Sequence, residues 1–258
     1  MKKKILVTGG VGFIGSNLIK ELIRHGHTLI SLDNYSTGSK KNEIDGVKYI
    51  NDDISNINKF DDNFDLCFHL ASQSRVQPSF SNPEESLRVN VNGTSSVMEW
   101  ARKNNIKVVY AGSSSRHHDP SDSPYAMYKF LGEEVCKLYR KSFNLKVEIA
   151  RFYNVYGPGE NIDEKYGNVI GIWKSKVLKG EPLPIVGDGE QKRDFIHVDD
   201  IVDGLIKISL SSIEHKDAWE LGTGVNYSVN ELFNLFKERF GVQSINIPNQ
   251  SGNYPETL

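Results

Sequence analysis

The sequence predicts an α/β fold, a Rossmann-type doubly wound parallel sheet followed by a smaller C-terminal lobe. Three observations support this prediction. Short runs rich in β-branched residues alternate with helical stretches over the first 150 residues, a glycine-rich loop follows the first run, and the alternation loosens after residue 151. Nearly continuous apolar strands that alternate with helices are typical of a parallel sheet covered on both faces. We therefore expect a first domain over residues 1–150 and a smaller lobe over residues 151–258.

The expected elements follow from the local patterns. A short apolar run bounded by turn residues predicts a strand, and apolar residues on one face, such as Phe13, Leu18 and Leu22, predict a helix. These criteria give strands at 4–7, 29–32, 47–50, 66–70, 108–110 and 147–150, and helices at 13–25, 83–104 and 124–143. Glycine and proline clusters mark turns beyond residue 151, and helical patterns return near 168–179, 198–210 and 229–240. We expect this last part to cover the carboxyl edge of the sheet.

The composition is that of an ordinary globular chain, with 38% hydrophobic residues, 25% charged residues and a net charge of −2. This charge gives no support for a nucleic-acid-binding face. No apolar stretch approaches the ~20 residues that cross a membrane, and the run at 5–7 is too short for the core of a signal peptide. Cys67 and Cys136 lie within a predicted strand and helix, which favours reduced core residues. We expect a cytoplasmic protein with no nucleic-acid, membrane or metal partner.

The glycine-rich loop carries the first functional pattern. Gly9, Gly12 and Gly15 lie between the first strand and the first helix, which Phe13 and Ile14 open. Glycines at this spacing allow a tight turn, close approach of a pyrophosphate, and close packing of helix on strand. The helix N-terminus supplies unpaired N–H groups and a partial positive charge. The pattern predicts a dinucleotide site over residues 1–150; the alternative is an ordinary turn between a strand and a helix.

Two acidic positions refine this prediction. Asp33 ends the second strand, 18 residues after Gly15. A carboxylate there can accept both ribose hydroxyls of NAD and would repel the 2′-phosphate of NADP, so NAD is the expected cofactor. The alternative is a cap or turn residue in the pair Asp33-Asn34. Asp53-Ile54, after the third strand, is placed to bracket an adenine, or else Asp53 is a solvated loop acid.

A tyrosine and a lysine supply the candidate chemistry. Tyr125 and Lys129 are four residues apart on a predicted helix and therefore lie on one face. A neighbouring ammonium favours the phenolate, and a tyrosine tuned in this way can remove a hydroxyl proton near neutral pH. Both residue types are common, so the pair alone is a weak signal. Its position after the glycine-rich loop, the strand-end Asp33 and a serine cluster favours a catalytic role.

Taken together, these residues resemble the extended short-chain dehydrogenase/reductase family, and within it the NAD-dependent nucleotide-sugar epimerases and dehydratases. The resemblance covers nearly the whole chain. Its further motifs are FHLA at 68–71, NVNGT at 90–94, SSS at 113–115, RFYNVYGPG at 151–159, GDGEQKRDFIHVDD at 187–200 and LGTG at 221–224. The resemblance implies a nucleotide-diphosphate sugar as the substrate, bound by the lobe at 151–258.

The resemblance also implies roles for individual residues. Ser115 would be the hydroxyl partner of Tyr125, and Lys129 would also hold the nicotinamide ribose. Leu70 and Ala71 would pass under the cofactor. Two residues, Asn154 and Arg193, would bind the diphosphate side of the sugar nucleotide, since a guanidinium grips phosphate oxygens in a bidentate manner. Arg75 either recognises an acidic group on the sugar or faces solvent.

The chain departs from the family pattern at three places. The segment 116–124 is short, and it has Arg116-His117 where the sugar dehydratases of the family carry an Asp-Glu pair. His117 either replaces that acid–base pair, because imidazole titrates near neutrality, or is an ordinary loop residue. A late arginine of the family is replaced by the neutral Gln250. The chain stops at Leu258, so we expect a lobe shorter than that of the relatives.

The leading hypothesis is an NAD-dependent 4-epimerase of a nucleotide sugar, most simply a UDP-sugar, that acts through a transient 4-keto intermediate. A 4,6-dehydratase and a 4-keto reductase are enzyme alternatives, and a non-catalytic NAD-binding sensor or scaffold is an alternative of another class. The resemblance also implies a homodimer formed by the helices at 83–104 and 124–143. Their apolar residues would otherwise pack only against the sheet.

Overall fold

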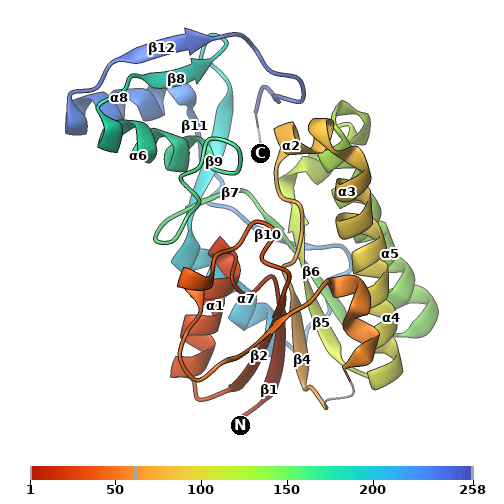
Figure 1. The fold of residues 1–258 in the computed structure, drawn as a ribbon. Coiled ribbons are helices and arrows are strands. Elements are labelled where there is room, and N and C mark those ends of the chain that lie inside the picture. The colour runs from red at the N-terminus through yellow and green to blue at the C-terminus, as the bar shows by residue number, and fades with distance from the viewer. Residues whose placement is uncertain (1, 61–62, 257–258) are drawn as a thin grey trace.

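A seven-stranded sheet forms the centre of the computed structural model, which describes residues 2–60 and 63–256 (Figure 1). All of its neighbouring strands are parallel, in the order β10–β6–β5–β4–β1–β2–β3. The predicted doubly wound parallel sheet is confirmed. The strands are β1 Lys4–Thr8, β2 Thr28–Asp33, β3 Lys48–Asn51, β4 Leu66–His69, β5 Lys107–Ser113, β6 Val147–Phe152 and β10 Trp219–Leu221.

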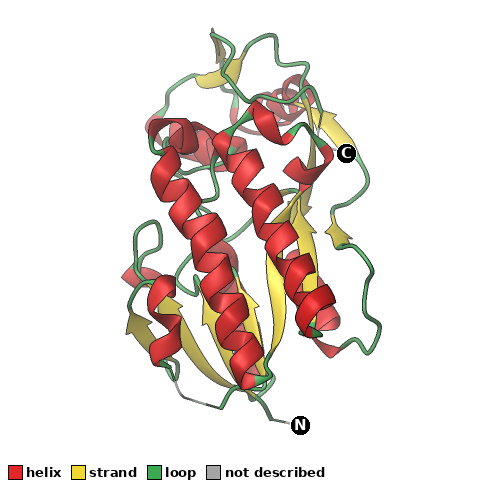
Figure 2. Cartoon of the chain, turned by 90° about the vertical axis from the view of Figure 1, so that its right-hand side faces the viewer, coloured by secondary structure: helices red, strands yellow, loops and turns green. Residues whose placement is uncertain are grey.

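Helices cover both faces of this sheet, which explains why its strands are apolar throughout. Helices α1 (Phe13–Arg24) and α7 (Val198–Leu210) bury Leu18, Leu22 and Leu205 on one face. Helices α4 (Thr94–Asn104) and α5 (Pro124–Phe143) lie side by side over the other face (Figure 2). There Met98, Trp100 and Cys136 are almost completely buried.

The helix expected over 83–104 is interrupted by one wider turn. It consists of α3 (Pro83–Leu87), a π-helical segment (Arg88–Gly93) and α4, preceded by the short α2 (Val76–Ser81). Such π segments occur frequently at functional sites. Here the segment carries Asn90, whose side chain bonds both the N–H and the carbonyl of Gln73 at 2.9 Å. The wider turn therefore fixes the loop that follows β4.

The strand order places a crevice at one edge of the sheet. From β1 the chain proceeds to β2 and β3 on one side, whereas β4, β5 and β6 lie on the other side. The connections therefore diverge between β1 and β4. In open α/β sheets, ligands bind at the carboxyl ends of the strands at this switch point.

The smaller part of the molecule lies beyond these carboxyl ends (Figure 1). It packs Trp173, Phe233 and Phe236 into a core of its own. Its elements are α6 Val169–Lys179, α8 Val229–Phe240, the paired strands β8 Leu183–Val186 and β12 Ser244–Ile247, and the sheet of β7 Asn154–Tyr156, β9 Lys192–His197 and β11 Asn226–Ser228.

Two elements after residue 150 join the large sheet. Strand β10 pairs with β6, and α7 packs against α1. The division into 1–150 and 151–258 remains a prediction about domains, and it assigns these two elements to the second part. In the portion of the chain that the structure describes, no helix is both long and apolar enough to span a bilayer.

Candidate active site

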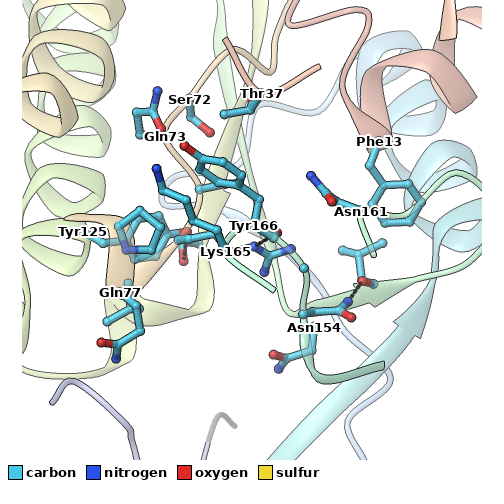
Figure 3. Close-up of a pocket in the computed structure, with 18 of the residues that line it drawn as sticks. Phe13, Thr37, Ser72, Gln73, Gln77, Tyr125, Asn154, Asn161, Lys165 and Tyr166 are labelled. Atoms are coloured by element: carbon cyan, nitrogen blue, oxygen red, sulfur yellow. Dashed lines mark hydrogen bonds between the residues drawn. The ribbon is translucent and has the colours of Figure 1, made fainter. Parts of the chain in front are cut away.

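A cavity of about 1230 Å³ lies at the switch point, between the carboxyl ends of the sheet and the smaller part (Figure 3). Single-ligand pockets are commonly about 300–1,000 Å³, so this one has room for a dinucleotide and a second molecule. Every site residue expected from the sequence lines it. They are Gly9, Gly12, Phe13, Ile14, Gly15, Asp33, Asn34, Asp53, Ile54, Leu70, Ala71, Arg75, Ser115, Tyr125, Lys129, Asn154 and Arg193.

The glycine-rich loop leaves no space for side chains. A Cβ on Gly9, whose φ is +74°, would lie 2.7 Å from the Ala71 nitrogen. A Cβ on Gly15 would lie 2.1 Å from the Gly9 carbonyl oxygen. Helix α1 begins after Gly12 without a side-chain cap and without an acidic residue in its first turn. Its N–H groups are thus available to an anion, and the loop fits the pyrophosphate of a dinucleotide.

Asp33 lies where β2 ends, beside this loop. One carboxylate oxygen accepts the Val11 N–H at 3.1 Å and the other accepts the Tyr35 N–H at 2.8 Å. Burial raises the pKa of Asp33, and these two hydrogen bonds oppose that rise. Because a carboxylate has about four acceptor positions, Asp33 can hold the loop and still accept ribose hydroxyls. The expected NAD site therefore fits the residues present.

Asp53 is tied to the protein more firmly than the sequence indicated. Its carboxylate forms a bidentate ion pair with Arg88 at 2.9 and 3.0 Å and accepts the Asn34 amide at 3.1 Å. The Arg88 hydrogen bonds hold the pKa of Asp53 far below its usual range. Ile54, the next residue, is 5% exposed. Asp53 is thus an ionised wall residue of the cavity.

Tyr125 is set in place by the start of α5. Ser123 caps this helix by accepting the Ala126 N–H at 3.1 Å, and Pro124 occupies its first turn. The Tyr125 N–H donates to Ser79 Oγ at 3.0 Å, which ties α5 to α2. Burial raises the pKa of the Tyr125 phenol, while its hydrogen bond with Ser113 and the charge of Arg75 act in the opposite direction.

Lys129 lies one turn along α5 and is 4% exposed. Its ammonium donates to the Ala111 carbonyl and sits 4.7 Å from the centre of the Tyr110 ring. Burial lowers the pKa of Lys129 to about 8, against the opposing charge of Glu133. The expectation that Lys129 would lower the phenol pKa is wrong for the protein alone, because burial dominates at Tyr125 and the ammonium is turned toward Ala111.

The hydroxyl partner of Tyr125 is Ser113. The Tyr125 hydroxyl donates to Ser113 Oγ at 3.2 Å, and the Ser115 hydroxyl donates to the same Ser113 oxygen at 3.0 Å. Strand β5 ends at Ser113, and residues 114–117 form a helical turn. Both Ser113 and Ser115 line the cavity. The hydrogen bond expected between Ser115 and Tyr125 is made by Ser113 instead, and the role of Ser115 at the reacting sugar oxygen remains a prediction.

Two of the expected substrate residues, Asn154 and Arg193, line the wall of the cavity opposite Tyr125. The Asn154 amide donates to the Asp194 carbonyl at 3.2 Å. Arg193 donates to the Asn253 side-chain oxygen at 2.6 Å, and burial lowers the pKa of Arg193 to about 10. Arg75 donates through Nε to the Tyr166 carbonyl at 2.6 Å, so it lines the cavity and also bridges its two walls.

Arg116 and His117 do not line the cavity. The Arg116 guanidinium pairs with Glu134 at 2.9 Å and stacks over the Phe130 ring, on the side of α5. His117 Nε2 lies 3.1 Å from Glu220. The structure therefore contradicts the hypothesis that His117 replaces the acid–base pair of the dehydratases.

Two cavity segments were not predicted from the sequence. One is the loop that carries Asn161, Lys165 and Tyr166, and the other is the tail from Gln250 to Tyr254. The tail is anchored by the Asn253 bond to Arg193 and by stacking of Tyr254 on His118 at 3.9 Å. Gln250 had been noted only as a neutral replacement. Leu258, where the chain stops, lies outside the described residues.

The fold and the cavity together define a dinucleotide-dependent enzyme whose cavity contains the Tyr125 phenol. The model of the NAD dependent epimerase/dehydratase family matches residues 5–222. The chain therefore belongs to this family, and NAD is its cofactor.

Individual proteins that are similar in sequence carry names consistent with this family. A Methanocaldococcus jannaschii protein, provisionally named UDP-glucose 4-epimerase, is 37% identical over 257 residues, which are 92% of this chain and 82% of the relative. A UDP-glucuronic acid decarboxylase of Xenopus tropicalis is 29% identical over 93% of this chain but only 61% of its own length.

Solved structures with the same fold include two epimerases. The UDP-glucose 4-epimerase of Thermotoga maritima, with UDP-glucose, has a TM-score of 0.92 at 27% identity and covers 99% of this chain and 89% of its own. The UDP-N-acetylglucosamine 4-epimerase of Methanobrevibacter ruminantium, in complex with UDP-N-acetylmuramic acid, has a TM-score of 0.92 at 28% identity. The match covers 100% of this chain and 89% of that epimerase.

Proposed function

We propose that the chain is a nucleotide-sugar 4-epimerase that acts on a UDP-sugar through a transient 4-keto intermediate. The observation that carries this proposal is the Tyr125–Ser113 hydrogen bond, which lies in one cavity with the glycine-rich loop. A phenol in that position can exchange a proton with a sugar hydroxyl while the cofactor carbon is held nearby. The UDP-sugars named for the relatives support the choice of nucleotide.

The residues that would hold NAD follow the wall of the cavity. The α1 N-terminus would bind the pyrophosphate, Asp33 the adenosine ribose, and Asp53 with Ile54 the adenine side. Leu70 and Ala71 would lie under the cofactor, and Lys129 would hold the nicotinamide ribose. When bound, NAD accepts a hydride from the sugar carbon and later returns it.

Tyr125 would move the proton. With the positive charge of the oxidised cofactor beside it, Tyr125 would act as a phenolate that takes the C4 hydroxyl proton as the hydroxyl becomes a carbonyl, and as a phenol it would return that proton when the carbonyl is reduced. Ser113 holds the sugar oxygen and the phenol in line, and Ser115 donates a hydrogen bond to Ser113. A cavity of this size leaves room for the keto sugar to turn and present its other face. Arg193 and Asn154 would hold the diphosphate meanwhile.

Three alternatives are less well supported. Water elimination by a 4,6-dehydratase needs an acid–base pair beside the sugar, and Arg116 and His117 are bound to Glu134 and Glu220 instead. A 4-keto reductase would use reduced cofactor in stoichiometric amount, often NADPH, which Asp33 disfavours. A sensor or scaffold has no need of a tyrosine hydroxyl bonded to a serine in the cofactor cavity.

We also propose a homodimer in the cytoplasm. Val97, Met98 and Trp100 pack inside the subunit. Leu138 and Phe143 on α5, however, are 53% and 50% exposed, and they support an interface over α5. Light scattering should give twice the 29.1 kDa chain mass, and a single-chain mass would contradict the dimer. Two free, buried cysteines fit a reducing compartment.

A panel of nucleotide sugars with catalytic NAD tests the function. We expect conversion of at least one UDP-sugar to its C4 epimer, without accumulation of NADH at 340 nm. A 4-keto-6-deoxy product would identify a dehydratase, and stoichiometric consumption of reduced cofactor would identify a reductase. NAD binding without turnover of any sugar would favour the sensor.

A further inference from the structure

Several positively charged side chains line the cavity without an ion pair to an acid of the described residues. Of its acids, Asp53 is paired with Arg88, Glu164 and Glu181 are paired with Lys176, and Asp33 accepts two backbone N–H groups in the glycine-rich part. Four cationic side chains of the lining form no ion pair with an acid among residues 2–60 and 63–256: Arg75, Lys129, Lys165 and Arg193. The proposed function uses Lys129 for the cofactor and Arg193 for the diphosphate. Arg75 and Lys165 are left without a ligand.

Arg75 is anchored on the side of the cavity that carries the phenol. It immediately precedes α2, and Ser79 of the same helix accepts the Tyr125 N–H at 3.0 Å. Its Nε donates to the Tyr166 carbonyl at 2.6 Å, so the guanidinium is held from both walls. In Figure 3 the side chains of Lys165 and Tyr166 lie between Tyr125 and Asn154. The charge of Arg75 acts on the Tyr125 phenol, so Arg75 lies near the position proposed for the sugar.

Most of the donor capacity of Arg75 is unused. A guanidinium has five N–H groups, and among residues 2–60 and 63–256 the one hydrogen bond of Arg75 takes the N–H on Nε. Burial lowers the pKa of Arg75, which indicates a desolvated charge. Glu160, whose charge acts on Arg75, forms its ion pair with Lys174. A buried charge with no partner is costly, so a ligand anion would offset that cost.

We propose that the sugar bound in this cavity carries a carboxylate and that Arg75 binds it. This inference rests on the proposed function, because it names the substrate class of that site. The two terminal nitrogens of Arg75 match a carboxylate in a bidentate arrangement. Lys165, on the same loop as Tyr166, adds a second positive charge. The substrate is then a nucleotide-diphosphate sugar with its carboxylate at C6, or on an ether at C3.

Matched sugar pairs test this inference. UDP-glucuronate and UDP-glucose differ only at C6, and UDP-N-acetylmuramate and UDP-N-acetylglucosamine differ only in the C3 ether. We expect kcat/KM of the NAD-loaded enzyme to favour the acidic member of at least one pair by roughly ten- to hundredfold, as charge-assisted hydrogen bonds would give. Arg75→Gln should remove this preference by slowing the acidic sugar, with little change for the neutral one. Arg75→Lys should recover part of it.

The control is Arg24→Gln, which removes one positive charge from an exposed site at the end of α1. It should leave the preference unchanged. Equal rates within both pairs would overturn the inference, and so would an Arg75→Gln variant that slows acidic and neutral sugars equally. If no sugar is turned over, the proposed function fails. Calorimetric Kd values for the same pairs then decide the inference, which stands if the acidic sugars bind more tightly only when Arg75 is present.

Discussion

Tyr125→Phe is expected to lower kcat by roughly 10²–10⁴-fold, the usual contribution of a positioned acid–base group. The ring remains and keeps its packing, but no phenol oxygen is left to exchange the proton of the sugar hydroxyl. Steady-state turnover of the best sugar of the panel measures this effect. NAD affinity, measured by fluorescence titration, should be close to that of the unmodified enzyme.

Two serine variants provide the matched comparison. Ser113→Ala removes the oxygen that contacts Tyr125, whereas Ser115→Ala removes a hydroxyl that donates to Ser113. The Ser113 variant should therefore lose much more of kcat than the Ser115 variant. Full activity in Tyr125→Phe, or a larger loss in Ser115→Ala than in Ser113→Ala, would contradict the assignment.

Arg151→Met is expected to destabilise the fold by about 3–5 kcal/mol, because it leaves a buried carboxylate without its partner. Arg151 and Glu133 are 3% and 1% exposed and pair at 2.9 Å. Arg151 also pairs with Glu220 at 2.8 Å, which joins β10 to β6. Without Arg151, the nearest cation to Glu133 is Arg116, at 3.9 Å. Urea unfolding measures the change.

The control for this prediction is Arg102→Met. Arg102 forms a similar pair with Glu99, at 2.8 Å, but on the exposed surface of α4. Surface ion pairs contribute little, so this variant should unfold almost like the unmodified protein. The double variant Arg151→Met, Glu133→Leu should regain part of the lost stability, because no unpaired charge remains. Equal unfolding midpoints for the two single variants would contradict the account.

The parts of the fold with strong local patterns were predictable. Six strands of the large sheet and the helices of both parts lie within a few residues of their expected positions, because apolar periodicity marks them directly. Strand β10 was missed, since three residues between loops carry no such signal. The π-helical turn in 83–104 was also missed, because the apolar pattern continues across it.

The residues of the site also fall into those that a local sequence pattern indicates and those that it does not. The glycine-rich loop, Asp33, and the Tyr125–Lys129 spacing are local features, so the sequence indicates them. Ser113 and Ser115 are chemically identical, and the choice between them depends on where β5 ends and the next turn begins. The loop with Tyr166 and the tail with Asn253 reach the cavity only through tertiary packing, which no local pattern encodes.

The central claim is that Tyr125 and the cofactor oxidise and reduce the sugar at C4. A UDP-sugar that carries deuterium at C4 tests it most directly, with the product analysed by NMR. The account predicts that the epimer retains the deuterium at C4, because the hydride leaves and returns without meeting solvent, and that Tyr125→Phe forms almost none of this product. Epimer whose C4 deuterium has been replaced by solvent hydrogen would contradict the claim.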